Sequence, residues 1–399
     1  MLRLNKNSNI ARRESQPGMK PTQPRIIVLF GSPYLYGSER ANIDVFKALQ
    51  DDYPEAEVLF LTDKKNGHQA VHPHLEKLNL QYKPTYFHYR FLKSIGPVGW
   101  LVRLYEIFRG SLSLLWIIWR FRPSALYTSK EDYLLNFLPA VFLLRTPVVY
   151  RAGDSPLLHH KVYRLMWKYM AKRVQRFVCV SAYVQSTLVE AGVDPSKTEV
   201  IYSRPHKKYG KSKPKVERQG AYTVLFVGQI AEHKGLHLFV EAAIALCQRY
   251  ESLEFLIAGK VDPEDLFAQE QIAKVKEAQL SDRIRFLGFV LEVDQLYAHA
   301  DLHICPSVYE EPLANVLVDA KKYAIPSVIF PVGGLPEIIE HKVDGWICEN
   351  KSAADLEKAV EYCLLHPDLC LAMGQSAKAS LARLETDRFS QKWLEVFTQ

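Results

Sequence analysis

The 399-residue sequence lacks the cysteine and histidine spacings that hold metal ions. Its six cysteines are scattered along the chain, and none of them forms a Cys-x-x-Cys pair. The two short histidine groups, His72 with His74 and His159 with His160, have no further ligand at a metal-binding spacing. We therefore expect free, buried thiols in a reducing cytosol and no metal site.

Long apolar segments are also lacking. The longest charge-free apolar run with tryptophans is GSLSLLWIIW, residues 110–119, whereas a membrane-spanning helix needs about 20 residues. Residues 1–24 contain no apolar core of a signal peptide, and we expect them to form a disordered, basic tail. The sequence therefore predicts a cytoplasmic protein that does not cross a membrane.

The positive charge is confined to a few places. The net charge is +7, yet residues 1–25 and 86–122 each carry six basic side chains and one acidic one. The rest of the chain is weakly acidic, which is unlike a nucleic-acid-binding protein. No G-x-G-x-x-G follows the first apolar run, and no G-x-x-x-x-G-K-[ST] loop is present. The first absence argues against a nicotinamide dehydrogenase.

Short apolar runs of strand length alternate with helical patterns along most of the chain. These runs span residues 25–33, 56–62, 125–129, 147–153 and 176–181, then 223–228, 253–259, 283–290, 301–307 and 327–334. A basic stretch with two prolines, RPHKKYGKSKPKVERQG, separates the two series. Apolar strands alternating with helices indicate parallel sheets covered on both faces. The predicted fold class is α/β, with two tandem Rossmann-like, doubly wound domains facing a cleft.

Three glycine-bearing turns follow predicted strands, where such folds bind ligands. They are GSPYLYGSER, VGQIAEHKG and PVGGLPE. Any one of them has an ordinary structural explanation as a turn. Together they place backbone N–H donors near one edge of each sheet, and such donors favour an anion.

The stretch YEEPLANVLVDA carries a carboxylate at each end, Glu311 and Asp319. We expect Pro312 to begin a helix, and eight residues of helix rise by about 12 Å. That separation is too wide for a shared proton, but it suits a ligand with a sugar, a diphosphate and a ribose. Lys234, in a glycine turn, would supply a cation. An N-cap acid and a solvated aspartate would also explain the pair.

Taken in order, these segments resemble the retaining glycosyltransferases of family 4, which have the GT-B fold. FVGQIAEHKGLHLFVEA is similar to the family's strand, Lys-Gly turn and helix. CPSVYEEPLANVLVDA resembles its E-x7-E element, and PVGGLPEII its Gly-Gly-x-Pro-Glu loop. GSERANIDVFKAL resembles the first-domain loop that faces donor and acceptor. The resemblance covers nearly the whole chain after residue 24.

The resemblance implies specific roles for residues of this chain. Lys234 would bind the donor diphosphate, Glu311 the hydroxyls of the donor sugar and Asp319 the ribose. The implied catalytic residues are Glu311, Lys234 and Asp154. The implied donor-binding residues are Gly37, Ser38, Gly228, Gln229, Lys234, Glu311, Leu313, Ala314, Asn315, Asp319, Gly333 and Gly334.

The resemblance also divides the chain and names its partners. Residues 25–205 would form the acceptor domain, completed by a C-terminal helix at 386–399. Residues 206–220 would be a linker, and residues 221–385 the donor domain. The expected substrates are a nucleotide sugar and a carbohydrate or lipid-linked acceptor. Retention of configuration, no cofactor and no nucleic acid are expected.

Several positions depart from the family pattern. Gln229 stands where an arginine is usual, Gly153 where a histidine is common, and Asp319 where the second glutamate is expected. Arg151 or Arg204 is a candidate source of the missing charge. A sugar-nucleotide-binding subunit without turnover, and another GT-B enzyme such as a nucleotide-sugar epimerase, therefore remain alternatives.

Residues 89–122 are aromatic and basic. Such a segment is typical of a helix on an anionic membrane surface, which would place the protein peripherally at the inner face of a membrane. An ordinary helix covering the first sheet explains the pattern equally well.

Overall fold

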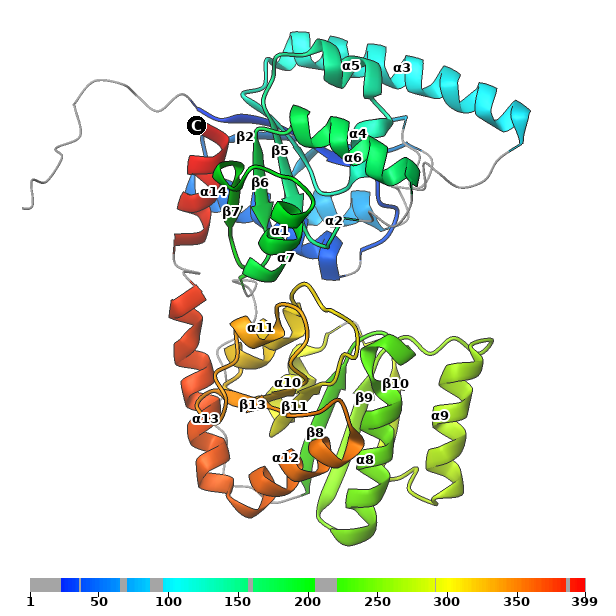
Figure 1. Ribbon diagram of the computed structural model, residues 1–399, viewed down its shortest axis with the longest axis vertical. Coiled ribbons are helices and arrows are strands. Elements are labelled where there is room, and N and C mark those ends of the chain that lie inside the picture. The colour runs from blue at the N-terminus through cyan, green and yellow to red at the C-terminus, as the bar shows by residue number, and fades with distance from the viewer. Residues whose placement is uncertain are drawn as a thin grey trace, which may run out of the picture.

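The computed structural model describes residues 23–35, 37–64, 70–86, 96–156, 161–204, 221–290, 292–384 and 388–398. The linker predicted at 206–220 lies outside the described residues, as does almost all of the N-terminal tail. The described chain forms two parallel sheets, each with helices around it (Figure 1). The predicted α/β fold class with two Rossmann-like domains is confirmed. We call the parts built on the first and second sheets the first and second domain.

The first sheet has seven parallel strands in the order β3-β2-β1-β4-β5-β6-β7. The strands are β1 (Arg25–Phe30), β2 (Glu57–Asp63), β3 (Gln81–Thr85), β4 (Ala125–Thr128), β5 (Val148–Ala152), β6 (Arg176–Cys179) and β7 (Thr198–Val200). The helices between them are α1 (Gly37–Asp52), α2 (Val71–Lys77), α3 (Pro97–Phe121), α4 (Glu131–Leu135), α5 (Leu138–Leu143), α6 (Lys161–Arg173), α7 (Ala182–Glu190) and the short η1 (Pro195–Lys197).

The second sheet repeats this order with six strands, β10-β9-β8-β11-β12-β13. The strands are β8 (Tyr222–Val227), β9 (Leu253–Ala258), β10 (Ile284–Gly288), β11 (Leu302–Cys305), β12 (Ser327–Ile329) and β13 (Gly345–Ile347). The helices are η2 (Glu232–Lys234), α8 (Leu236–Arg249), α9 (Leu266–Glu277), α10 (Asp294–His299), α11 (Asn315–Lys322), η3 (Leu335–Glu337), α12 (Ala353–Leu365), α13 (Pro367–Ala379), η4 (Ser380–Leu384) and α14 (Phe389–Thr398).

In each sheet the chain adds strands toward one edge and then, at one point, starts adding them toward the other edge. Such a reversal point favours ligand binding. In the first sheet the chain winds outward from β1 to one edge and then returns to β4 beside β1. In the second sheet β8 and β11 are the corresponding neighbours. Loops that leave the carboxyl ends of two such strands diverge and leave a crevice between them. The loops after β8 and β11 carry Lys234 and Glu311.

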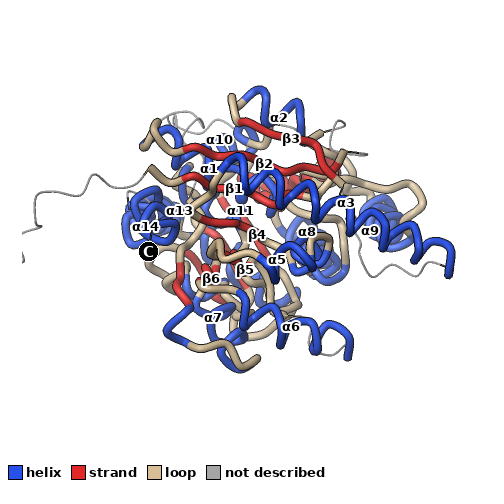
Figure 2. The backbone as a smooth tube through the Cα atoms, turned by 90° about the horizontal axis from the view of Figure 1, so that it is seen from above, coloured by secondary structure: helices blue, strands red, loops and turns tan. Residues whose placement is uncertain are grey.

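Helices cover both sides of the strands, as the view from above shows (Figure 2). In the first sheet, α1, α2 and α14 contribute buried residues to one face, and α3 to α7 contribute to the other. The central strand β1 explains this arrangement, because five of its six residues are buried. A strand that is apolar on both sides requires helices on both faces.

The last helix, α14, returns to the first domain (Figure 1). Trp393 is fully buried, and its ring lies 5.9 Å from that of Tyr127 in β4. Ser390 Oγ donates to the carbonyl oxygen of Ala48 in α1 at 3.2 Å. The C-terminal segment therefore packs on the face formed by α1 and β4, which lie far from it in the sequence.

Trp393→Ala should lower the free energy of unfolding by about 3–5 kcal/mol, because it leaves a large cavity under α14. Trp119→Ala provides the matched control, since that tryptophan is 71% exposed. Urea titration followed by circular dichroism measures both. Equal stability of the two variants would contradict the packing of α14.

Candidate functional site

Lys234 and Glu311 form an ion pair at the reversal point of the second sheet. Lys234 Nζ lies 2.6 Å from Glu311 Oε2 and also donates to the Tyr309 hydroxyl at 3.1 Å. Ser307 Oγ donates to the same Glu311 oxygen at 3.0 Å. Glu311 is only 7% exposed. The loops after two neighbouring strands thus hold one cation and one anion with fixed partners.

A glycine allows these two loops to meet. Gly235 ends the turn that carries Lys234 and adopts φ +72°, which favours glycine. A Cβ at this position would lie 1.8 Å from the carbonyl oxygen of Pro306, directly after β11. No larger residue fits there, so Gly235 sets the approach of the lysine to the glutamate.

The surroundings favour the charged form of the pair. Burial alone would lower the pKa of Lys234, but the Glu311 carboxylate and the Tyr309 hydroxyl outweigh it and raise that pKa. Burial, with the nearby Glu311 charge, raises the pKa of Tyr309 to about 12. Lys234 is therefore a cation and Tyr309 a neutral hydroxyl at physiological pH.

The helix after Glu311 begins later than predicted. α11 starts at Asn315, so the expectation of a helix from Pro312 is wrong. The carbonyl oxygen of Glu311, which a helix would pair with the N–H of Asn315, instead accepts from Gly334 N at 2.8 Å. Ala314, the residue before the helix, makes no side-chain capping bond. The first N–H donors of α11 therefore lack a capping side chain next to the ion pair.

The remaining predicted residues of this segment lie around the start of α11. Leu313 and Ala314 are buried, and Asn315 is half-buried. Asp319 is also half-buried and lies one turn into α11. It is close to the buried Tyr297. Burial is the largest cause that raises the pKa of this tyrosine, and the Asp319 charge is the next. Glu311 and Asp319 thus lie on either side of the helix start, and fewer helical residues separate them than predicted.

Gly333 and Gly334 pack against the backbone beside Glu311. A Cβ on Gly333 would lie 2.1 Å from the Glu311 carbonyl oxygen, and one on Gly334 would lie 2.1 Å from that of Pro312. Gly333 N donates to Glu310 Oε2 at 2.7 Å. These glycines let their loop approach Glu311 and shape the backbone that holds it.

The first domain contributes Gly37 and Ser38, which begin α1. A Cβ on Gly37 would lie 3.9 Å from Asn315 Nδ2 of the second domain. The start of α1 therefore lies next to the start of α11. Ser38 Oγ donates to Glu39 Oε2 at 2.9 Å, and Lys130 pairs with the other oxygen of that carboxylate at 3.1 Å.

Asp154 follows β5 in the first domain. Its Oδ1 accepts from Ser155 N at 2.9 Å. Partial burial raises the pKa of Asp154, Glu311 raises it further, and Lys234 opposes that shift. The three groups predicted to be catalytic are therefore close enough to affect one another, although they come from both domains.

Within the described part of the chain, Lys234 is the cation that contacts Glu311. Gly228, at the end of β8, donates its N–H to Ala258 O at 3.0 Å, and the next residue, Gln229, is exposed. Arg151 donates to Ser203 Oγ at 3.3 Å and lies over the Trp393 ring. Arg204 lies over the ring of Phe389. Both arginines contact α14, and the expectation that one of them replaces the missing charge stays a prediction.

Sequence reasoning missed the side chains that hold the pair. Ser307 and Tyr309 precede Glu311 by four and two residues, within a segment already chosen for its carboxylate. Ser307, Tyr309 and Glu311 are spaced two residues apart, and this spacing could have indicated that their side chains lie on one side of the loop. Among the described residues, no three His, Cys, Asp or Glu side chains gather at a metal-binding distance.

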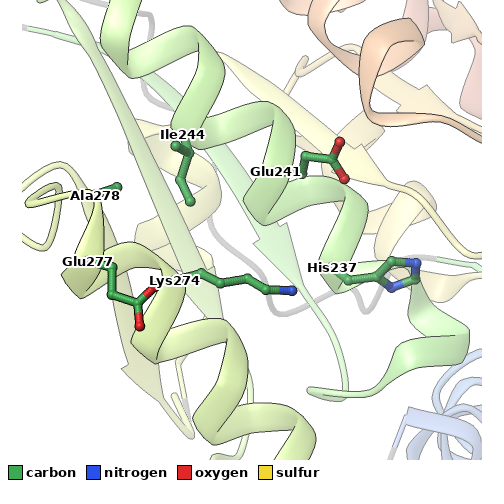
Figure 3. A pocket seen from close by; sticks show the side chains of 6 residues that line it. All are labelled: His237, Glu241, Ile244, Lys274, Glu277 and Ala278. Atoms are coloured by element: carbon green, nitrogen blue, oxygen red, sulfur yellow. The ribbon is translucent and has the colours of Figure 1, made fainter.

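A separate hollow of about 380 Å³ lies between α8 and α9 (Figure 3). His237, Glu241 and Ile244 line it from α8, and Lys274, Glu277 and Ala278 from α9 or just after it. None of the predicted site residues lines this hollow.

Comparison with known proteins identifies the family. Residues 210–380 match glycosyl transferases group 1, and residues 37–203 match glycosyltransferase family 4. An uncharacterized glycosyltransferase of Haemophilus influenzae is 22% identical over 235 residues, which are 59% of this chain and 64% of that protein. The match therefore spans less than two thirds of that relative's length.

Two solved structures share the fold. The glycosyltransferase of Rickettsia africae superposes with a TM-score of 0.80 at 17% identity, covering 94% of this chain and 98% of that one. Anabaena Alr3699/HepE, in complex with UDP and glucose, superposes with a TM-score of 0.75 at 20% identity, covering 94% and 100%. Two family matches that together span both domains, with this shared architecture, place the chain among the group 1, family 4-like glycosyltransferases of GT-B fold.

Proposed function

We propose that this glycosyltransferase moves a hexose from a nucleotide sugar to a carbohydrate or lipid-linked acceptor, with retention of configuration. The Lys234–Glu311 pair at the reversal point of the second sheet carries this proposal. It lies beside the uncapped start of α11, where Asn315 faces Gly37 of the first domain. A UDP-sugar is the donor that we infer, since Alr3699/HepE has the same fold and holds UDP and glucose.

The charged and polar residues of the predicted site receive chemical tasks in this proposal. Lys234 and the first N–H groups of α11 bind the diphosphate and stabilise its charge as it leaves. Glu311 accepts hydrogen bonds from hydroxyls of the sugar, and Asp319 from the ribose. Gly228 and Gln229 line the nucleotide side. The diphosphate competes with Glu311 for the lysine, because both are anionic acceptors. No metal is required for this charge stabilisation.

The transfer step exchanges two bonds at the anomeric carbon. The bond to the diphosphate oxygen breaks, and its electron pair leaves with that oxygen. The acceptor hydroxyl forms the new bond on the same face, and its proton passes to the departing diphosphate. Asp154, on the acceptor side, orients this hydroxyl by accepting a hydrogen bond.

A nucleotide-sugar-binding subunit without turnover is the second candidate. The observation that favours it is the exposed, uncharged Gln229 beside the site. Donor binding with no transfer to any acceptor and no hydrolysis would identify this candidate. An epimerase would instead convert the donor without an acceptor.

The face of the first domain that α3 presents to solvent supports a peripheral membrane location. Its exposed apolar side chains are Leu101, Val102, Leu104, Tyr105, Phe108, Leu112, Trp116 and Trp119, each more than half exposed. The opposite side of the same helix buries Arg103 and Ser111. Over residues 101–112, α3 exposes apolar side chains and buries polar ones, which is the reverse of an ordinary surface helix. Figure 1 shows α3 along the outer edge of the molecule, next to α5.

The charge around this face selects an anionic lipid surface as its partner. Helix α3 and the residue after it carry three exposed arginines, Arg109, Arg120 and Arg122, against one acidic residue, the half-buried Glu106. A second copy of the chain would oppose this positive charge with its own, whereas anionic lipid complements it. No helix within the described ranges has the length and apolar character that a bilayer crossing requires. We infer that the protein lies on the inner face of a membrane.

Lys234→Ala should reduce transfer by at least about 100-fold, because one donor that stabilises the leaving charge is lost. It should also remove the thermal shift that UDP produces in the wild type. Lys274→Ala is the control, since this lysine pairs with Glu270 on α9. A folded Lys234→Ala protein with wild-type turnover would refute the site.

Activity should rise with pH as Asp154 ionises, because the carboxylate form accepts the hydrogen bond. The pKa of Asp154 is raised by burial, so the acidic limb of the kcat profile lies above the ordinary pKa of aspartate. Asp154→Asn should lower kcat and abolish this limb. An unchanged limb in the variant would assign the titration to another group.

The wild-type protein should float with vesicles that contain phosphatidylglycerol and much less with pure phosphatidylcholine. Phe108→Asp with Trp119→Asp should abolish flotation, since both side chains belong to the exposed apolar face. Phe289→Asp is the control, because this phenylalanine is 67% exposed on the second domain. Flotation by the double variant, or association of the wild type into dimers without lipid binding, would contradict the proposal.

A further inference from the structure

The carboxylate of Glu337 joins the two domains. It belongs to η3 in the second domain, yet its Oε2 accepts from Ala182 N at 2.7 Å and its Oε1 from Tyr183 N at 2.6 Å. These two N–H groups begin α7 of the first domain. Tyr202 OH, at the end of the first-domain chain, donates to Oε2 at 3.0 Å. One side chain thus receives three hydrogen bonds from the opposite domain.

This contact is strong for its size because a negative charge meets a helix N-terminus. The first N–H groups of a helix have no partner within it, and they favour an anion. Ser181 Oγ accepts from Val184 N at 3.2 Å, which leaves the N–H groups of Ala182 and Tyr183 for Glu337. Hydrogen bonds to an ionised acceptor are about twice as strong as neutral ones.

The tyrosine remains a donor throughout the physiological range. Burial, followed by the charge of Glu337, raises the pKa of Tyr202 to about 12. The hydroxyl therefore keeps its proton when the carboxylate is ionised. All three hydrogen bonds exist together at neutral pH.

The loop that carries Glu337 also shapes the donor side of the site. Gly334 N donates to the Glu311 carbonyl oxygen at 2.8 Å, three residues before Glu337. A Cβ on Gly334 would lie 2.9 Å from Ser181 Cβ of the first domain. A single short loop therefore contacts the backbone of Glu311 on one side and the start of α7 on the other.

We propose that Glu337 is a positioning residue that fixes the closure of the two domains and so holds Asp154 opposite the Lys234–Glu311 pair. This inference rests on the proposed function for its kinetic consequence, although the closure itself does not depend on catalysis. A carboxylate with three donors defines both the distance and the orientation of the facing loops. Without it, the first domain is free to rotate away while the donor residues of the second domain stay in place.

Glu337→Gln tests this role, because an amide keeps the size of the side chain but has one acceptor oxygen and presents N–H groups to the facing donors. Transfer kcat should fall by about 10-fold to 100-fold, consistent with the sensitivity of transfer to small misplacements. The Kd for UDP should change less than twofold, since Lys234 and α11 are untouched. Glu340→Gln is the matched control, because that carboxylate pairs with Arg383 within the second domain.

Closure is measured independently of turnover. Hydrogen exchange at the amides of Ala182 and Tyr183 should accelerate in Glu337→Gln, and small-angle X-ray scattering with UDP should give a larger radius of gyration than in the wild type. Glu340→Gln should leave both unchanged. Wild-type exchange and scattering in Glu337→Gln would overturn the proposal, whatever the activity. Faster exchange without any transfer by the wild type would instead leave closure supported and refute the proposed function.

Discussion

The ion pair between Lys234 and Glu311 is the interaction around which the second domain arranges its loops. Burying a carboxylate to 7% exposure carries a desolvation cost, and a paired charge in such a place is weak evidence for stability. An apolar pair would hold the loops after β8 and β11 together at a smaller cost. The retention of both charges, with hydrogen bonds from Ser307 and Tyr309, is therefore better explained by a ligand that needs them.

Glycines connect this pair to the rest of the molecule. Gly235 lets the lysine turn pass against the end of β11, and Gly334 lets the next loop pass against Pro312 and Ser181. Through that loop the backbone of Glu311 is linked to Glu337 and so to the start of α7. The surroundings of the Lys234–Glu311 pair and the relative placement of the domains thus depend on neighbouring contacts of one short loop.

The sequence predicted the central strands well because each is an uninterrupted apolar run. It missed β3, β7 and β13, which lie at sheet edges, where one side of the strand is unpaired. β3 contains Pro84, which an edge tolerates and a central strand does not. The placement of Lys234 and Glu311 at one strand-end surface followed from strand ends and glycine turns, but their direct ion pair did not. The later start of α11, the contacts of Arg151 and Arg204 with α14, and the bonds to Glu337 did not. They depend on contacts between residues far apart in the sequence, which local patterns do not record.

The measurement that most directly tests the donor site is a crystal structure of the protein with UDP. The expected result is a diphosphate oxygen within hydrogen-bonding distance of Lys234 Nζ, another at the first N–H groups of α11, and the ribose near Asp319. Glu311 should then have lost its contact with the lysine or share it with the nucleotide. UDP bound in the hollow between α8 and α9, with the Lys234–Glu311 pair unchanged, would contradict this site.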